Sequence, residues 1–347
     1  MEIVSYNEYD FFNRDNHFAR YENIKSKLLY GRAKNNAQLS IVMPVYNRTQ
    51  YIRESIESAI NQNTTYIYNI IVVDNTEEND SIYDIVKTYP EDEVMYYKNE
   101  KNIGMFGNWN RCIEIADTPW IAMLHDDDKL MPEYVETILN IITAYPDCVG
   151  VGVEHNYIND SSVVFDRGLD FGGVKKLKTI DYYLNTCPTH IAGFAFRKDA
   201  AMDIGGFDED YYPGSDANFM CKLHILKGEV WKINKALLQY RVAANESTNP
   251  KTLRQFVLYN YIQIKALVKY MNSFYKFFYD LHQNALILEG MKSASLFNNN
   301  VYFNDIKKFL NYKYTPLVGI YKVALKLMRP YLWERFIKKI KKVGGLL

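Results

Sequence analysis

Between residues 39 and 124, four short apolar runs alternate with longer stretches of mixed polarity. The runs are 39–45 (LSIVMPV), 69–74 (NIIVVD), 93–97 (EVMYY) and 120–124 (WIAML). Each run is too short for a helix and has the β-branched composition of a buried strand. Strands that alternate with helices imply right-handed crossovers, and therefore a mainly parallel α/β sheet covered on both faces. This alternation limits the fold more than any other feature of the chain.

The stretch after the first run has the period of an amphipathic helix. Its apolar residues Ile52, Ile56, Ala59 and Ile60 fall three or four positions apart, so they share one face. In a sheet built from such units, ligands bind beyond the carboxyl ends of the strands. The loops that follow the four runs are therefore the first place to look for a site.

These loops carry most of the acidic and amide side chains of the region. They read PVYNR, DNTEEND, NEKNIGMFGNWN and HDDDKLMP in chain order. The last one places Asp126, Asp127 and Asp128 in one tight turn. Adjacent carboxylates raise each other's pKa unless a cation or hydrogen-bond donors compensate them. A divalent cation, Mg²⁺ or Mn²⁺, is one natural compensation, and such an ion usually keeps positions for substrate phosphate.

A simpler interpretation of this loop stays open. The acids could form a solvated loop that caps a helix starting near Pro132, where the helix dipole favours negative charge.

Five segments in order now carry a family resemblance. They are LSIVMPVYNR, IIVVDN, KNIGMFGNWN, WIAMLHDDDKLMP and IGGFDEDYYPGSD. Together they resemble the family 2 glycosyltransferases, inverting enzymes of the GT-A fold that use nucleotide-diphospho-sugars. The resemblance covers about residues 39–245 and depends on all five segments. It implies a GT-A sheet flanked by helices and a helical C-terminal extension.

The resemblance assigns donor-binding roles in the first three loops. Pro44, Tyr46 and Asp74 match positions that hold the base and ribose, and an ionised Asp accepts hydrogen bonds from imide and hydroxyl groups. Standing alone, Asp74 would be taken for an ordinary turn acid. A second set of matches, to a segment that lines the donor site, consists of Asn102, Gly104 and Asn110.

The acidic loop departs from the family's usual Asp-x-Asp-Asp pattern. Alignment on the following Leu-x-Pro places His125 where the first Asp normally stands. The resemblance makes Asp127 the principal ligand of Mn²⁺ or Mg²⁺, with Asp128 beside it, and places Asp126 near the ribose or diphosphate. His125 is a ligand, a hydrogen-bond donor or a packed residue, and the last two are favoured.

Inverting transfer also requires a general base, because the acceptor hydroxyl loses a proton as it attacks. The family's base is the Asp of a Glu-Asp pair that follows a Gly-Gly-Phe-Asp-Glu turn. Here that pair is Ser215-Asp216, so Asp216 is the expected base. An N-cap for the next helix is the alternative role. Arg241 matches a region where relatives often carry a basic residue over the diphosphate, although a surface arginine is the commoner explanation.

The net charge is zero, but it is unevenly distributed. From Asp305 to the end there are eleven Lys and Arg against two acids, so the preceding 304 residues carry a charge of −9. Beyond Pro316, aliphatic and aromatic residues accompany eight of these basic residues. Such a basic amphipathic helix is typical of peripheral contact with an anionic membrane surface, and an ordinary solvated helix is the alternative.

Other features exclude whole classes of protein. The four cysteines lie more than thirty residues apart and form no C-x-x-C pair, so a zinc ribbon or a disulfide scaffold is not expected. The sequence has no run of 18 apolar residues and no secretory leader, which predicts a cytoplasmic protein at the inner face of the cell membrane. No nucleic-acid-binding module is visible.

The expected organisation has three parts. Residues 1–38 form a helical or irregular extension, and residues 39–250 form the catalytic domain, with a nucleotide-binding half (39–128) and an acceptor half (129–250). Residues 251–347 form a helical region that ends in the basic tail.

The expected function is transfer of a sugar from a nucleotide-diphospho-sugar, UDP-linked by preference, to a hydroxyl of a glycan or lipid-linked oligosaccharide. A catalytically silent GT-A binding protein is the first alternative, because His125 and Ser215 depart from the family pattern. A nucleotidyltransferase is the second, although the first loop lacks the glycines of a phosphate loop.

Overall fold

The computed structural model describes residues 8–159, 163–165, 170–242, 250–295 and 315–328. The chain divides into two compact units. One, the sheet unit, consists of residues 13–177 and 189–243, and the other, the helical unit, consists of residues 1–12, 178–188 and 244–347. The functional boundaries expected at residues 38, 128 and 250 stay predictions.

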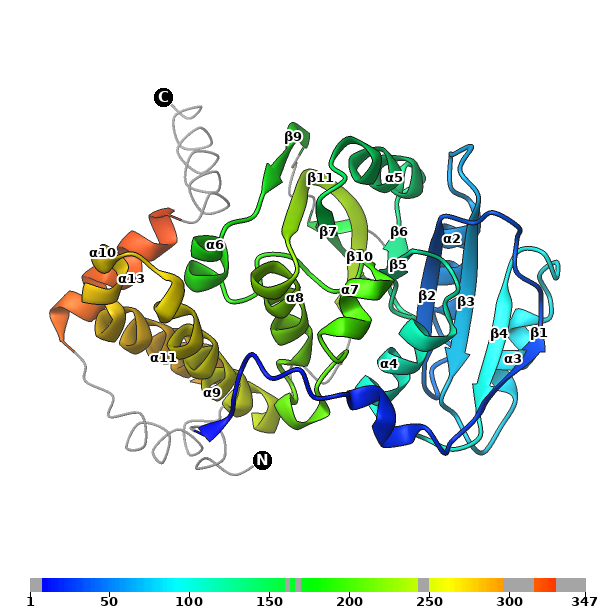
Figure 1. Ribbon diagram of the computed structural model, residues 1–347, viewed down its shortest axis with the longest axis horizontal. Coiled ribbons are helices and arrows are strands. Elements are labelled where there is room, and N and C mark those ends of the chain that lie inside the picture. The colour runs from blue at the N-terminus through cyan, green and yellow to red at the C-terminus, as the bar shows by residue number, and fades with distance from the viewer. Residues whose placement is uncertain (1–7, 160–162, 166–169, 243–249, 296–314, 329–347) are drawn as a thin grey trace. The chain divides into compact units, whose positions relative to one another are not determined.

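Eleven strands of the described residues form one sheet in the sheet unit (Figure 1). Its main path has the order β1-β4-β3-β2-β5-β10-β7-β11-β6, with β8 paired to β7 and β9 to β11. The strands are β1 (Ser26–Tyr30), β2 (Leu39–Val45), β3 (Tyr68–Asp74), β4 (Met95–Asn99), β5 (Trp120–Met123), β6 (Lys129–Leu130), β7 (Cys148–Ile158), β8 (Val163–Phe165), β9 (Asp170–Lys176), β10 (Ala195–Arg197) and β11 (Glu229–Arg241).

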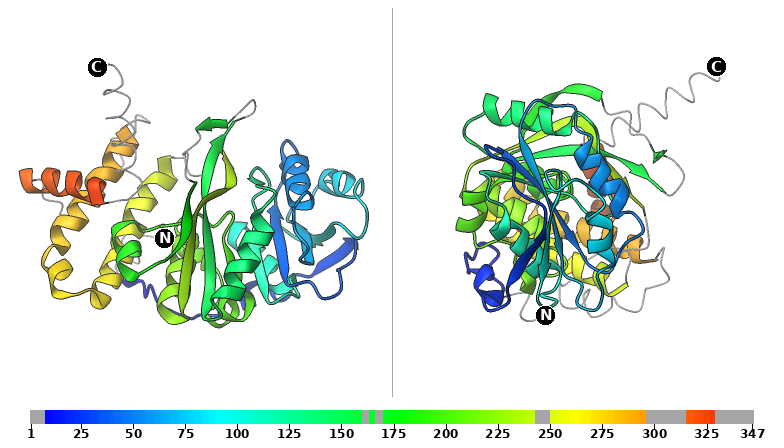
Figure 2. Two further views of the ribbon diagram at one scale, coloured as in Figure 1. Left: turned by 90° about the horizontal axis from the view of Figure 1, so that it is seen from above. Right: turned by 90° about the vertical axis from the view of Figure 1, so that its right-hand side faces the viewer.

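The four apolar runs are confirmed as strands β2, β3, β4 and β5, which lie parallel to one another. Every residue of β2 and β3 is buried, as continuous apolar runs in a doubly covered parallel sheet require. The predicted α/β fold with helices on both faces is therefore confirmed (Figure 2).

The expectation of a helical or irregular segment for residues 1–38 is wrong in part. Ser26–Tyr30 form β1, which pairs antiparallel with the outer edge of β4. Leu28 and Leu29 remain 46% and 48% exposed, so this strand carries no buried apolar alternation that the sequence could show. The pairing supplies hydrogen-bond partners for the open edge of β4 instead.

Helices of the sheet unit follow the strands as expected. They are α2 (Ile52–Ile60), α3 (Ser81–Val86), α4 (Met105–Ile115), α5 (Tyr134–Ala144), α7 (Lys198–Asp203) and α8 (Ser215–Leu226), with short 3-10 turns η1 (His17–Tyr21) and η2 (Glu209–Tyr211). The predicted face of α2 is confirmed, since Ile52, Ile56 and Ala59 are fully buried.

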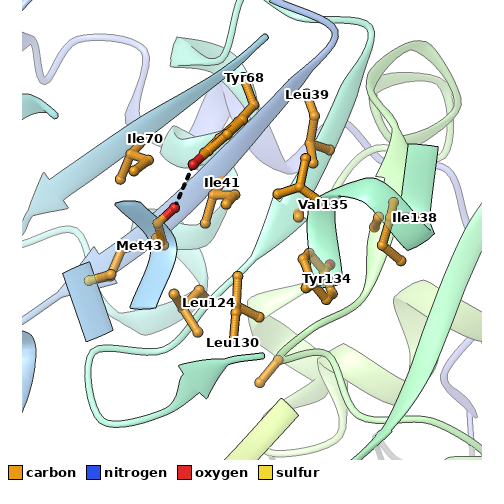
Figure 3. Packing of buried hydrophobic residues seen from close by; sticks show 14 of the residues in the cluster. Leu39, Ile41, Met43, Tyr68, Ile70, Leu124, Leu130, Tyr134, Val135 and Ile138 are labelled. Carbon is orange, nitrogen blue, oxygen red and sulfur yellow. Dashed lines mark hydrogen bonds between the residues drawn. The ribbon is translucent and has the colours of Figure 1, made fainter. Parts of the chain in front are cut away.

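The main core joins one face of the sheet to α2, α3 and α5. Figure 3 shows Ile41 and Met43 of β2 in one cluster with Tyr134 and Val135 of α5. The hydroxyl of Tyr68 donates to the carbonyl of Ala59 at 2.9 Å, so this buried phenol is satisfied by the end of α2. These contacts fix the strands whose carboxyl ends carry the polar loops.

The helical unit confirms the helices expected after residue 250. Its described helices are α6 (Thr179–Leu184), α9 (Pro250–Leu267), η4 (Val268–Tyr270), α10 (Ser273–Phe277), α11 (Tyr279–Ser295) and α13 (Pro316–Met328). Within it, His282 stacks on Tyr183 and meets the Tyr183 carbonyl at 2.8 Å. No described helix is both long and apolar enough to cross a membrane. Most of the predicted basic tail, residues 329–347, lies outside the described residues.

Candidate functional site

The polar loops meet along one edge of the sheet. Strands β4, β3, β2 and β5 are parallel neighbours, so the loops after them leave from the same side. Strand β10 runs antiparallel to both β5 and β7, and β11 runs parallel to β7. The carboxyl ends of β7 and β11 therefore point to the same edge, as ligand sites in such sheets require.

The acidic loop after β5 is buried, and an arginine from the first loop compensates its charge. Asp126, Asp127 and Asp128 are only 3%, 7% and 0% exposed. Arg48 donates from Nη1 to Asp127 at 2.7 Å and pairs through two nitrogens with Asp126. Burial raises the pKa of Asp126 to about 6, although Arg48 opposes the shift. The alternative of a solvated acidic loop is therefore wrong, because these carboxylates are enclosed.

Arg241, the last residue of β11, holds the same loop from the other side. Its Nε donates to the carbonyl of Asp127 at 2.8 Å, and its backbone N–H donates to Asp128 Oδ1 at 2.8 Å. Its Nη2 also reaches Glu54 at 2.9 Å, and the guanidinium lies 4.1 Å above the Tyr51 ring. The residue is 2% exposed, which rules out the surface-arginine explanation. The structure thus shows Arg241 as a support of the acidic loop.

His125 packs beside this loop. Its ring lies 5.3 Å from the Trp109 ring, and its Nδ1 lies 3.5 Å from Asp128 Oδ2. Burial alone would lower the pKa of His125, but the Asp128, Asp127 and Asp126 carboxylates outweigh it and raise that pKa. These contacts are those of a packed residue paired with Asp128, and packing is one of the two roles favoured for it.

His125, Asp127 and Asp128 also have the geometry of a cation site. One ligand atom from each lies within 4.8 Å of the others. Within the described residues, Asp128 Oδ2 and His125 Nε2 are buried and accept or donate no hydrogen bond. Two carboxylates and an imidazole suit Mn²⁺, and the carboxylates suit Mg²⁺. The residues therefore fit the divalent cation expected for this loop.

Asp216 lies in the first turn of α8, where it is half-buried. The N-cap of this helix is Gly214, so the alternative N-cap role for Asp216 is wrong. Its Oδ1 accepts from the Ala217 N–H at 2.8 Å. Burial raises the pKa of Asp216, and the charge of His125 partly offsets the shift.

Tyr240 connects the two acidic regions electrostatically. Burial raises the pKa of its phenol, and the charges of Asp128, Asp127, Tyr157 and Asp216 raise it further. The carboxylates at 127, 128 and 216 therefore all lie close enough to this phenol to act on its charge. Residues far apart in the sequence thus lie near one phenol, and their shared catalytic role stays a prediction.

Asp74 ends β3 beside Val45, the last residue of β2, so it lies at the same edge. The side chain is 0% exposed, and both of its oxygens are engaged. Tyr96 Oη donates to Oδ2 at 2.7 Å, and the Thr76 N–H donates to Oδ1 at 2.8 Å. This carboxylate therefore already has protein partners, and its predicted contact with a nucleoside stays a prediction.

Pro44 and Tyr46, the other two residues expected to hold the base and ribose, differ in exposure. Pro44 is a buried residue of β2, whereas Tyr46 follows the strand and is 50% exposed. Tyr46 therefore presents its side chain to solvent at this edge of the sheet, and the predicted contact of Pro44 and Tyr46 with a base stays a prediction.

An amide network shapes the third loop. Asn75 donates to Asn102 Oδ1 at 2.7 Å and to the Gly104 carbonyl at 3.2 Å, while Asn99 donates to Asn75 Oδ1 at 3.0 Å. Gly104 has a φ of 75°, a left-handed conformation that favours glycine, and it is the N-cap of α4. Asn102 and Gly104 are exposed at the ligand edge.

Asn110 lies deeper on α4 and is 2% exposed. Its Nδ2 donates to the Phe207 carbonyl at 2.9 Å, and its Oδ1 accepts from the Phe207 N–H at 2.7 Å. Its amide therefore links α4 to the turn that precedes Asp216. Its predicted contact with the donor stays a prediction.

Sequence reasoning missed two parts of this site. Arg48 stood in the first loop but was given no role, and its position at the shared edge was the available signal. Asn75, Asn99 and Asn108 form a buried chain of amides, since Asn99 also donates to Asn108 Oδ1 at 2.8 Å. A run of asparagines at strand ends was the signal for it.

Comparisons with known proteins agree on the fold and the family. The chain resembles the crystal structure of S. aureus TarS 1–349 in complex with UDP-GlcNAc, with a TM-score of 0.55, 14% identity, and coverage of 83% of this chain and 92% of that one. It also resembles the mannosyltransferase PcManGT from Pyrobaculum calidifontis in complex with GDP-Man and Mn²⁺, with a TM-score of 0.51, 12% identity, and coverage of 95% and 89%. The fold is thus that of the GT-A glycosyltransferases.

Sequence comparison supplies the family. Residues 40–205 match the model of glycosyl transferase family 2. The minor teichoic acid biosynthesis protein GgaB of Bacillus subtilis is 27% identical over 234 residues, which are 63% of this chain and 24% of GgaB. This chain therefore spans about a quarter of that relative's length. Residues 40–205 of this chain thus form a glycosyl transferase family 2 domain.

Proposed function

We propose that the protein is an inverting glycosyltransferase of cell-surface polysaccharide synthesis. It moves a sugar from a nucleotide-diphospho-sugar, UDP-linked, to a hydroxyl of a glycan or lipid-linked oligosaccharide. The observation that carries the proposal is the cluster of His125, Asp127 and Asp128, whose ligand atoms fit a cation, with Asp216 close enough to act on the same Tyr240 phenol as Asp127 and Asp128. GgaB, named for teichoic acid biosynthesis, and the UDP-GlcNAc complex of TarS support the choice of pathway class and donor.

In this proposal Asp216 is the general base. A base must be ionised to accept the acceptor's proton, and burial raises the pKa of Asp216 toward the range in which a carboxylate accepts a proton more readily. Ser215, which replaces the family's Glu, is buried and uncharged, so no second carboxylate precedes Asp216. Asp216 can then lose its charge and regain it without repulsion from an adjacent acid.

The donor lies across the edge of the sheet, with Tyr46, Asn102 and Gly104 exposed toward it. Asp127 and Asp128, with His125 beside them, would hold Mn²⁺ or Mg²⁺. When bound, such an ion stabilises the charge that develops on a departing diphosphate. Arg48, 47% exposed along its side chain, can exchange its contact with Asp127 for a phosphate oxygen.

The proposal includes peripheral contact of the C-terminal tail with the inner face of the cell membrane. In the described part of the tail, Leu317, Ile320 and Val323 are 62%, 66% and 58% exposed. Their spacing of three residues places them on one side of α13, and the strongly basic residues 329–347 follow. An apolar face beside basic residues favours peripheral binding to anionic lipid. Sedimentation with phosphatidylglycerol vesicles tests this contact. We expect the protein to sediment with the vesicles, and to stop doing so when residues 329–347 are removed.

Thermal unfolding with UDP and UDP-GlcNAc, with and without Mn²⁺, tests the donor and the cation together. We expect UDP to raise the melting temperature mainly when Mn²⁺ is present, and Asp127→Ala to abolish this dependence. Asp84→Ala, which removes an exposed carboxylate of α3, is the matched control and should behave as the wild type. Equal stabilisation by UDP in all conditions and variants would refute the cation site.

Release of UDP from UDP-GlcNAc then separates an enzyme from a silent binding protein. The proposal expects Mn²⁺-dependent release, whereas a silent protein binds UDP-GlcNAc and leaves it intact.

A further inference from the structure

A segment before the first parallel strand lies against the turn that leads to Asp216. We call residues 13–21 the strap and residues 205–210 the glycine turn. The His17 N–H donates to the Gly205 carbonyl at 3.2 Å, and Asn13 Nδ2 donates to Asp208 Oδ2 at 3.4 Å. His17 Nε2 also lies 3.6 Å from Asp208 Oδ2. The strap therefore contacts the glycine turn through backbone and side chains.

The approach of the two segments is close enough to require glycine. Gly205 and Gly206 have φ values of 85° and 78°, which favour glycine on conformational grounds. A Cβ on Gly205 would overlap the carbonyl of Asp15, and a Cβ on Gly206 would lie 2.7 Å from the Phe18 ring. The strap is thus part of the reason why this turn has two glycines.

Charged groups add a second layer of contact. Arg20 lies 2.8 Å from Asp210 and 3.5 Å from Glu209, and Tyr21 Oη donates to Glu209 Oε2 at 2.8 Å. Burial and then the Glu209 carboxylate raise the pKa of Tyr21 to about 12, so the phenol keeps the proton that it donates. The side chain of Glu209 is only 18% exposed, which makes this contact stronger than a solvent-facing one.

Glu209 also reaches the helix that follows the donor loop. Its Oε1 lies 3.1 Å from the position of a Cβ on Gly107, in the first turn of α4, and the Tyr21 ring lies 2.7 Å from the same position. The first turn of a helix has free N–H groups and a partial positive charge, so a carboxylate is favourable there. Arg111 of α4 in turn donates to the Tyr21 carbonyl at 3.0 Å. Glu209 therefore joins the strap, the glycine turn and α4.

We infer that the strap, through Tyr21 and Glu209, positions the Asp216 segment relative to the donor loop. Both are positioning residues, and the inference rests on the proposed function for its catalytic meaning. Glu209 begins η2, the Gly214 N–H donates to the Tyr211 carbonyl at 2.8 Å, and α8 starts at Ser215. A displacement of Glu209 is thus transmitted through one short turn to Asp216. A shift of about 1 Å in a reacting group can lower a rate by about a hundredfold.

The test uses the full-length chain with Tyr21→Phe, Glu209→Gln and the double variant. Tyr30→Phe is the matched control, because Tyr30 Oη donates to the Tyr89 carbonyl at 2.6 Å in the same N-terminal region but away from the glycine turn. Three quantities are measured in Mn²⁺, namely UDP affinity by calorimetry, UDP release from UDP-GlcNAc, and amide hydrogen exchange of residues 205–217.

We expect Tyr21→Phe and Glu209→Gln each to lower UDP release by about fivefold to tenfold. UDP affinity should stay within about twofold of the wild type, and exchange in residues 205–217 should become faster. The double variant should lose little more than either single variant, because the two groups share one hydrogen bond.

Unchanged exchange and UDP release in both variants, as in Tyr30→Phe, would overturn the inference. Loss of UDP affinity in proportion to UDP release would also overturn it, because the strap would then act on donor binding alone. If the wild type releases no UDP, the proposed function fails, while the exchange measurement still decides whether the strap holds the turn.

Discussion

Two acidic regions of the sheet unit are held in different ways. The loop of Asp126, Asp127 and Asp128 follows a buried strand and is enclosed by Arg48 and Arg241. Asp216 lies on α8, accepts one described hydrogen bond from Ala217, and depends on a turn held by the strap. The first region follows a strand of the parallel sheet and lies within the matched residues 40–205. The second depends on contacts with a segment outside the matched residues 40–205.

This difference separates two kinds of requirement. A cation site needs dense, compensated negative charge, whereas a general base needs freedom to change its protonation state. Arginines beside the carboxylates serve the first purpose and would oppose the second, since a nearby cation keeps a carboxylate ionised. The described contacts of Asp216 include no arginine or lysine, in keeping with the proposed role.

The largest expected effect comes from substitution of Asp216 itself. Asp216→Asn should lower sugar transfer by about 10²–10⁴-fold, because the amide cannot accept the proton. UDP affinity in Mn²⁺ should be unchanged, since the cation site is separate. Asp199→Asn, at an exposed carboxylate of α7, is the matched control. Full turnover by Asp216→Asn would assign the base to another residue.

The next effect tests whether Arg241 holds the acidic loop. Arg241→Met removes the bonds to the Asp127 carbonyl, to the Asn159 carbonyl and to Glu54 in a buried place. We expect the free energy of unfolding to fall by about 2–4 kcal/mol in urea titrations.

Arg197→Met, which removes an arginine that is 37% exposed, should change the free energy of unfolding by less than about 0.5 kcal/mol. Equal effects of the two substitutions would mean that Arg241 contributes no more than a surface ion pair.

The third prediction concerns Arg48, whose removal should strengthen cation binding. Arg48→Met removes the positive charge beside Asp126 and Asp127, so the loop attracts a cation more strongly. Mn²⁺ affinity, measured by calorimetry without nucleotide, should rise by about tenfold, or about 1.4 kcal/mol. An unchanged affinity would show that Arg48 and the cation do not share these carboxylates.

The smallest effect concerns the strap and pH. Burial lowers the pKa of His17, helped by Lys222 and Arg20 and opposed by Asp208 and Asp15. The unfolded chain therefore takes up this proton first as the pH falls, so stability from neutral His17 is complete well above pH 6.5 and decreases as the pH falls through that value. His17→Gln should flatten the decrease in unfolding free energy between about pH 7.5 and 5.5. An identical pH profile would contradict burial of His17 in the strap.

The sequence predicted the regions that have a strong local pattern. Continuous apolar runs predicted β2 and β5, and the acidic loop after β5 does gather Asp127 and Asp128 in one cluster with His125, while the cation itself stays a prediction. Contacts between distant segments left no such pattern. Arg241 looked like a surface residue until β11 placed it against the acidic loop, and β1 shows no alternation because most of its residues are exposed. The strap was missed for the same reason, since its partners are about 190 residues away.

Asn110 adds a practical consequence, because its amide bonds the Phe207 backbone in both directions. The loop before α4 and the turn before α8 are therefore parts of one assembly. A chimera that imports a relative's donor loop to change sugar preference would have to import residues 205–210 and the matching strap with it.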